Sequence, residues 1–176
     1  MKIIGFAGSN SSKSINKKLV QYTLDQLKDV ETEWVDIKDY PLPVFGVDLE
    51  EEIGHPENVK KFVDKLQSAD GIVISLAEHN GSYSVAAKNL LDWCSRYESK
   101  FFKSKPVLLM GTSPGAYGAK NVLGAAKLRL PKFDAQLIEV FSLPSFEDNF
   151  SATKGILDTT LRKEYETAIH KFITHL

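Results

Sequence analysis

Three short apolar runs constrain the fold of this chain more than any other feature. The run at residues 71–76 reads Gly-Ile-Val-Ile-Ser-Leu, and similar runs occupy residues 2–8 and 107–111. Strands that are apolar on both faces suit a parallel sheet covered by helices on both sides. Because parallel strands are joined by crossovers, a helix is expected between each run and the next strand.

Two weaker strand patterns and several helical patterns alternate with these apolar runs. Residues 31–36 and 136–140 are predicted to form two further strands. The helical spacing of apolar residues predicts helices at 15–28, 82–96, 119–130 and 158–172, together with one that His55-Pro56-Glu57 opens. This order predicts an α/β fold, a three-layer α/β/α sandwich with a five-stranded parallel sheet.

Residues 37–54 are expected to form a loop between the second strand and the helix that follows. Within it, Glu50 to Glu52 are most simply read as a solvated turn. Long loops beside sites often cover them, so the segment from Tyr40 to Gly54 is also a candidate cover for a substrate.

Composition describes one globular domain over residues 1–176. The chain is 43% hydrophobic and 26% charged, with a formal net charge of −1 and no long basic stretch, so nucleic acid is not an expected partner. Cys94 is the single cysteine and is expected to be a small buried hydrophobe. No leader pattern, membrane-length apolar run or metal spacing of histidines is visible, which favours a cytoplasmic protein without membrane or metal partners.

The first loop, residues 9–14, has a polar composition that suits an anion. Five of its six residues are Ser or Asn, and it joins the first strand to the first helix. The first N–H groups of a helix are unpaired and lie at the positive end of its dipole, so this loop is a candidate phosphate cradle. Neither the P-loop motif nor G-x-G-x-x-G is present. The alternative is an ordinary turn in which a serine caps the helix.

Two more loops follow apolar strands. The second loop, residues 77–84, comes after Leu76, and the third loop, residues 111–118, comes after Met110. Ligands of doubly wound sheets bind at the carboxyl ends of the strands, so one ligand is expected to contact all three loops.

The three loops carry a family resemblance. The segments are Gly8-Ser9-Asn10-Ser11-Ser12-Lys13-Ser14-Ile15-Asn16, Ala77-Glu78-His79-Asn80-Gly81-Ser82 with Lys88-Asn89-Leu90-Leu91-Asp92-Trp93, and Ser113-Pro114-Gly115-Ala116-Tyr117-Gly118. In this order and spacing the chain resembles, over almost its whole length, the flavodoxin-like NADPH-dependent FMN reductases. That family includes flavin, quinone, chromate and azo-dye reductases.

The resemblance implies an FMN-dependent NAD(P)H oxidoreductase. A hydride would pass from NADPH or NADH to FMN N5 and on to a quinone, an azo compound, a metal oxyanion or free flavin. No side-chain acid or base is required for the hydride step, so no catalytic residue is assigned.

The resemblance also implies a set of cofactor-binding residues. The first loop and helix start would hold the FMN phosphate, the second loop would run along the isoalloxazine ring, and the third would line its other side. In that order the residues are Ser9, Asn10, Ser11, Ser14, Ile15 and Asn16; Glu78, His79, Asn80 and Gly81; and Ser113, Gly115 and Tyr117. The resemblance further implies a homodimer or homotetramer, with Leu90, Leu91 and Trp93 as candidate contacts between subunits.

Three positions depart from the family pattern. Ser11 replaces an arginine, Ala77 a proline and His79 a tyrosine. Losing one charge-assisted hydrogen bond costs on the order of 1.5–3 kcal/mol, so these changes weaken FMN binding more than folding. Two alternatives therefore remain open: a flavodoxin-type electron carrier, which the near-neutral charge disfavours, and a non-catalytic family member with weak or lost FMN binding.

Overall fold

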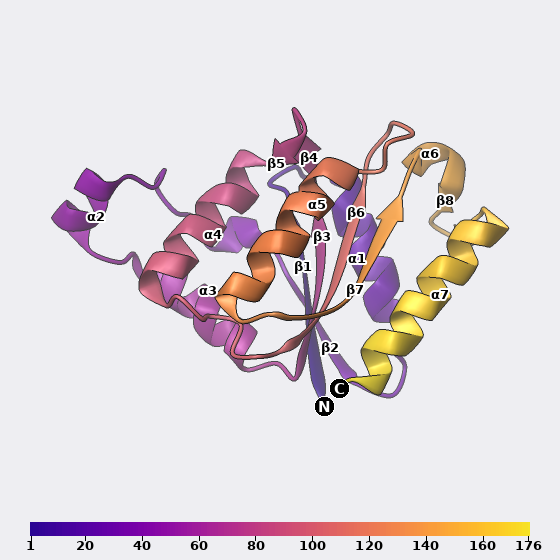
Figure 1. Cartoon of the computed structure of the whole chain (residues 1–176), viewed down its shortest axis with the longest axis horizontal. Helices are drawn as coiled ribbons and strands as arrows, with labels where there is room; N and C mark the ends of the chain where they lie inside the picture. The colour runs from indigo at the N-terminus through magenta and orange to yellow at the C-terminus, as the bar shows by residue number, and fades with distance from the viewer.

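A five-stranded parallel sheet forms the centre of the molecule (Figure 1). The computed structural model describes all residues from 1 to 176. The strand order is β2-β1-β3-β6-β7, and every neighbouring pair is parallel. The strands are β1 (Lys2–Gly8), β2 (Glu31–Val35), β3 (Gly71–Leu76), β6 (Pro106–Thr112) and β7 (Gln136–Leu143). The predicted five-stranded parallel sheet is confirmed, although β7 continues three residues beyond its predicted end at 140.

Helices cover both faces of this sheet. One core joins the sheet to α3 (Glu57–Gln67), α4 (Val85–Tyr97) and α5 (Lys120–Arg129), and the other joins it to α1 (Ile15–Gln26) and α7 (Thr159–Thr174). Alternation along β3 serves both cores, because Ile72 and Ile74 face the first and Val73 faces the second. The predicted three-layer α/β/α sandwich is confirmed.

The start of the predicted helix at 82–96 is wrong. Residues 82 and 83 form β5 (Ser82–Tyr83), which pairs antiparallel with β4 (Glu78–His79), and α4 begins only at Val85. Asn80 and Gly81, at φ of 51° and 74°, make the two-residue turn between the strands. An Asn-Gly pair favours such positive φ values and therefore a hairpin. The hairpin takes up residues 82 and 83, so the helix can begin only after them.

The loop predicted over 37–54 is wrong in part, because the segment contains a 3₁₀ turn at Ile37–Asp39 and the helix α2 (Val47–Ile53). Acidic residues in the first turn of α2 match its dipole. Glu50 lies on this helix, where it accepts hydrogen bonds from Arg96 Nε at 2.9 Å and lies 3.3 Å from His55 Nε2. Arg96 holds the pKa of Glu50 below its usual value. Glu50 therefore ties α2, which stands off the body in Figure 1, to α4 and is not part of a solvated turn.

Small elements complete the chain. They are the 3₁₀ turn at Leu130–Phe133, α6 (Phe146–Asn149), β8 (Phe150–Ser151) and β9 (Gly155–Ile156), the last two paired in a short hairpin. Cys94 is fully buried as expected, and burial raises the pKa of its thiol. None of the helices combines the length and apolar composition needed to span a bilayer.

Candidate functional site

The serines of the first loop accept hydrogen bonds from its own backbone. Ser9 Oγ accepts from the N–H of Ser11 at 3.3 Å, and Ser11 Oγ accepts from the N–H of Lys13 at 3.2 Å. Ser14 Oγ caps α1 by accepting from the N–H of Lys17 at 3.2 Å. Because each hydroxyl is used here as an acceptor, its hydrogen is still available for a ligand.

Several backbone donors around this loop have no acceptor within the protein. The N–H groups of Asn10, Ser12, Ile15 and Asn16 make no intramolecular hydrogen bond. They surround the N-terminus of a 12-residue helix, where the dipole favours negative charge. Free N–H groups and serine hydroxyls form a donor set that fits a phosphate, such as that of FMN.

The side chain of Asn16 has a different role from the one predicted. It is 2% exposed, and its Oδ1 accepts from Ser75 Oγ at 2.7 Å and from the N–H of Thr112 at 3.0 Å. Its Nδ2 donates to the carbonyl of Thr112 at 3.1 Å. The amide therefore joins α1 to the ends of β3 and β6, and only the backbone N–H of Asn16 remains for a phosphate.

Two contacts join the second loop to its neighbours. Ser84 Oγ donates to the carbonyl of Gly8 at 2.8 Å, at the start of the first loop. The Glu78 carboxylate accepts from the N–H of Val122 at 2.9 Å and from Asn121 Nδ2 at 3.1 Å. It thereby caps α5, whose own N-cap position, Ala119, offers no side-chain acceptor. The side chain of Glu78 is thus directed at α5 and is engaged within the protein.

The remaining predicted residues of the second loop lie at the surface. His79, Asn80 and Gly81 are exposed at the tip of the hairpin. Gly81 lies next to α5, because a side chain there would contact Asn121. The hairpin tip therefore lies against the start of the helix that follows the third loop.

The third loop is held by its own residues and by α6. The carbonyl of Gly115 accepts from Ser113 Oγ at 3.1 Å and from the N–H of Ser145 at 2.9 Å. Gly118, at φ 62°, has no room for a side chain beside Ser142. The position of Gly115 is open, and Tyr117 is 58% exposed. An aromatic side chain at the rim and open space above a glycine leave room for a flat ring.

Four residues that organise the site were not predicted from the sequence. Ser75 and Thr112 bind Asn16, Ser84 binds Gly8, and Ser142 Oγ donates to the carbonyl of Gly118 at 2.7 Å. A polar residue inside an apolar run, as at Ser75, signals a buried partner, since such groups are hydrogen-bonded. The sequence does not say which partner.

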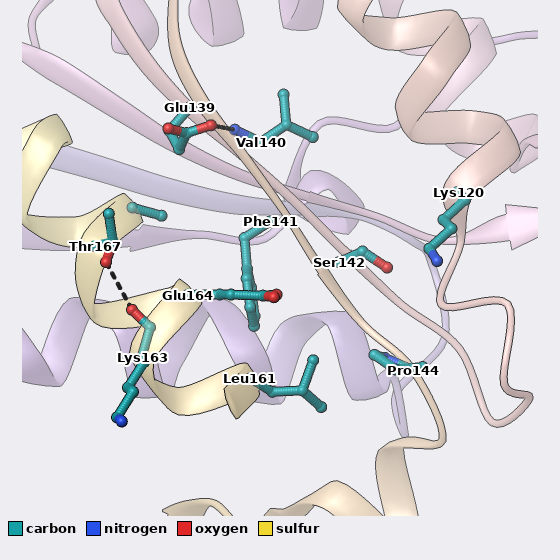
Figure 2. Close-up of a pocket in the computed structure, with 11 residues that line it drawn as sticks. Lys120, Glu139, Val140, Phe141, Ser142, Pro144, Leu161, Lys163, Glu164 and Thr167 are labelled. Atoms are coloured by element: carbon teal, nitrogen blue, oxygen red, sulfur yellow. Dashed lines mark hydrogen bonds between the residues drawn. The ribbon is translucent and has the colours of Figure 1, made fainter. Parts of the chain in front are cut away.

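A further cavity has none of the three loops in its lining and borders the third loop through Ser142 and Pro144. It has a volume of about 650 Å³ and runs along the edge strand β7, between the start of α5 and the side of α7 (Figure 2). Glu139 on its wall accepts from the N–H of Val140 at 3.1 Å and pairs with Lys171. A second cavity, of about 320 Å³, borders the first loop at Asn10.

Comparison with known proteins points to one family. The family model that describes NADPH-dependent FMN reductases matches residues 1–148. The chain is 27% identical to an NADH:(hydroxy)cinnamate reductase subunit of Vibrio ruber, across 98% of this chain and 86% of the relative. It is 28% identical to an NAD(P)H-dependent FMN reductase of Pseudomonas aeruginosa, across 93% and 88%.

A solved structure of a flavoenzyme has a similar fold. A solved structure of the flavoenzyme FerB, an NAD(P)H:(acceptor) oxidoreductase from Paracoccus denitrificans, is similar with a TM-score of 0.73 and 25% identity. The similarity covers 99% of this chain and 98% of FerB.

Proposed function

Since this chain belongs to the NADPH-dependent FMN reductase family, we propose that its three loops hold FMN and that it uses NAD(P)H to reduce a small-molecule acceptor. FMN, when bound, supplies the redox chemistry, because it takes up a hydride from NAD(P)H and returns the electrons to an acceptor. The protein supplies binding, orientation and electrostatics. Relatives named as FMN and quinone reductases support an enzyme over an electron carrier.

The donor set of the first loop is the observation that carries this proposal. Ser9, Ser11 and Ser14 would donate hydroxyl hydrogens to the phosphate, because their oxygens already accept from the backbone. The free N–H groups of Asn10, Ile15 and Asn16 would add to them. These donors offset the missing arginine at position 11, and Lys13 adds positive charge to the loop.

The second and third loops would enclose the ring. Backbone groups of Glu78 to Gly81 would run along one side, and Ser113, Gly115 and Tyr117 would line the other. The capping of α5 by Glu78 supports this role, since it fixes the second loop against the helix that the third loop enters. His79, exposed at the hairpin tip, is free to pack on a bound ring. The acceptor would be a quinone, an azo compound, a metal oxyanion or free flavin.

A flavin titration combined with turnover tests this function. The absorption spectrum of the purified protein is recorded before and after FMN is added and the excess is removed. NADPH and NADH oxidation is then followed with 1,4-benzoquinone. We expect a retained flavin band and a rate above that of free FMN. A bound flavin without turnover would favour the electron carrier, and no bound flavin in a folded protein would favour the non-catalytic alternative.

Assembly into a homodimer or homotetramer is proposed through the surface shared by α4 and α5. Leu90 and Trp93, two of the predicted contact residues, are 5% and 0% exposed in the core, so they are unavailable to a partner. Leu91, the third, is partly buried and lines a cleft between α4 and α5 with Tyr83, whose hydroxyl is buried without a hydrogen-bond partner. Leu128 on α5 is 78% exposed. Leu128→Glu should shift the mass measured by light scattering to that of a smaller assembly. Ile173→Glu, on α7, is the matched control.

A cytoplasmic location is proposed because NAD(P)H, the proposed reductant, is an intracellular metabolite. Cell fractionation with an antibody to the native protein tests it. Recovery in the membrane or extracellular fraction would contradict it.

A further inference from the structure

The cleft between α4 and α5 has no role in the site described above. Its volume is about 280 Å³, just below the range of about 300–1,000 Å³ that is usual for small-molecule pockets. Leu91 and Ser95 line it from α4, and Ala125 and Arg129 line it from α5. Tyr83, the last residue of β5, also belongs to the lining, so the cleft reaches the hairpin of the second loop.

The hydroxyl of Tyr83 has no partner within the protein. It is buried and makes no hydrogen bond, whereas the buried hydroxyl of Tyr165 donates to Thr23 Oγ1 at 3.0 Å. Burial raises the pKa of Tyr83, so its hydroxyl keeps its hydrogen at neutral pH and is a donor. An unsatisfied buried donor is costly, and buried tyrosine hydroxyls usually have a partner. The unpaired hydroxyl therefore indicates an acceptor that this chain does not supply.

Arg129 is a second unused donor in the same cleft. Of the three arginines of the chain, Arg96 pairs with a carboxylate of α2, and Arg162 donates to a backbone carbonyl. The guanidinium of Arg129 has neither kind of partner and lies over the ring of Phe133, with its central carbon 5.4 Å from the ring centroid. Its positive charge opposes the rise in the pKa of Tyr83, so the two groups lie near one another. Two donors without acceptors, one of them charged, thus line one cleft.

The other polar side chains of the lining already have partners. Lys88 Nζ donates to both carboxylate oxygens of Asp92 at 2.6 Å, and Ser95 Oγ donates to the carbonyl of Asp92 at 2.9 Å. Asp92 is the one acidic residue of the lining, so no carboxylate there is left to pair with Arg129. The rest of the lining is the apolar surface of Leu91, Ala125 and Phe133.

A carboxylate on an apolar body fits these groups. Its oxygens accept from a tyrosine hydroxyl, and a guanidinium donates to it through two N–H groups. The apolar body would remove the apolar wall of the cleft from water. Because the Tyr83 hydroxyl is closed to solvent, a side chain must shift when the ligand enters. Arg129 is exposed and moves without breaking an ion pair.

We propose that the cleft between α4 and α5 binds a small carboxylic acid in its anionic form, with the carboxylate between Tyr83 and Arg129 and the body along the apolar wall. The site needs neither FMN nor NAD(P)H, so it is independent of the proposed function. It lies in the surface proposed for assembly, where an acidic side chain of a second copy is the other source of a carboxylate. The experiment separates these two sources.

Benzoate is the probe, because it is a carboxylate on a small apolar ring. It is titrated into the full chain with FMN present and followed by NMR, and Kd is taken from the amide signals of Leu91 and Ala125. Arg129→Ala should weaken binding roughly ten- to a hundredfold and Tyr83→Phe about fivefold, because each removes one donor. Benzamide, which has the same ring without the charge, should bind roughly tenfold more weakly than benzoate.

Lys127→Ala is the matched control, because it removes an exposed positive charge from α5 outside the cleft. Its Kd for benzoate should stay within about twofold of the native value, since salt screens exposed charges at a distance. Equal weakening in Lys127→Ala and Arg129→Ala would show a general attraction to positive charge and would overturn the site. Absence of shifts at Leu91 and Ala125 would overturn it as well.

Leu128→Gln separates a free acid from the side chain of a second copy. It disfavours the proposed assembly without adding a charge beside Arg129. An equal Kd for benzoate in the native protein and in Leu128→Gln would support the free acid. Binding seen only in Leu128→Gln would show that a second copy fills the cleft in the native protein, and would overturn the small-molecule site.

Stability gives a readout that does not depend on the probe. Tyr83→Phe removes a buried hydroxyl without a partner, so its midpoint of urea unfolding, measured without benzoate, should be no lower than the native one. Tyr165→Phe, which loses the hydrogen bond to Thr23, should lower the midpoint. An equal fall in both variants would show that the Tyr83 hydroxyl has a partner in the free protein, and would contradict the site.

Discussion

The first loop and the cavity along β7 differ in how their polar groups are used. Around the first loop, serine oxygens and the Asn16 amide bind the protein, so N–H groups and hydroxyl hydrogens remain for a ligand. Along β7, Glu139 accepts the outward N–H of Val140 and pairs with Lys171. The free donors of the first loop are therefore backbone N–H groups and serine hydroxyls held by the fold, whereas those of the cavity are the exposed ammonium groups of Lys120 and Lys163.

The contrast is in how the donors are held, and cavity size does not decide it. An edge strand is protected from other strands when charged side chains cover its free groups, and Glu139 does this for β7. A phosphate site needs the reverse, because an anion binds where donors have no other partner. Four substitutions test the contrast.

Ser9→Asp should have the largest effect. A carboxylate about 4 Å from a phosphate costs about 4 kcal/mol at an effective dielectric constant of about 20, which is roughly a thousandfold in Kd for FMN. Fluorescence titration of FMN into the apoprotein measures it, with circular dichroism as the check on folding. Ser99→Asp, at an exposed serine without a hydrogen bond, is the control. An unchanged Kd for FMN in Ser9→Asp would show that the phosphate does not bind at the first loop.

Asn16→Ala should lower the free energy of unfolding by about 3 kcal/mol, because Ser75 and Thr112 lose their buried partner. Urea unfolding measures it. Asn58→Ala removes an exposed hydrogen bond to the carbonyl of Pro41 and should cost less than about 1 kcal/mol. Equal effects of the two substitutions would argue against Asn16 as the residue that joins the strand ends.

Glu78→Ala should cost about 1 kcal/mol, the value of a helix cap, because Val122 loses its acceptor. FMN affinity should fall with it, since the second loop is no longer fixed to α5. Glu78→Gln keeps a carbonyl oxygen and should recover part of both losses. If Glu78→Ala lowers stability and leaves FMN affinity intact, the capping contact does not position the second loop.

Glu139→Gln should have the smallest effect, at most about 0.5 kcal/mol at pH 7, because the pair with Lys171 is partly exposed. Lys171 holds the pKa of Glu139 below its usual value. Its contribution is therefore complete above the ordinary carboxyl pKa of about 4 and is lost as pH falls through the folded value. Urea unfolding should show that the free energies of unfolding of the variant and the native protein differ at pH 7 and become equal in acid. A change in FMN affinity would refute the contrast.

The sheet was predictable because its information is local. The runs at 2–8, 71–76 and 107–111 are apolar on both faces, and such strands form a parallel sheet only when helices cover both faces. The first loop was predictable for the same reason, since its residues follow a strand and precede a helix. The Asn80-Gly81 hairpin also had a local signal, which the helical spacing after Ser82 obscured.

The partners of polar side chains were not predictable. Asn16 meets Ser75 across 59 residues of sequence and Thr112 across 96, and Glu78 meets Val122 across 44. Asn16 and Glu78 both look like ligand contacts in their motifs, and both turn out to bind the protein through their side chains. Their actual partners depend on which elements lie side by side.

By itself the sequence determined the alternation of strands and helices along the chain, the polar first loop and the resemblance to the family. Only the tertiary structure decided which donors of that loop stay free, which side chains hold the loops together, and where the cleft between α4 and α5 lies. The physical reason is that backbone conformation follows from neighbouring residues, whereas a hydrogen bond or a cavity wall needs groups that only the packed fold brings together.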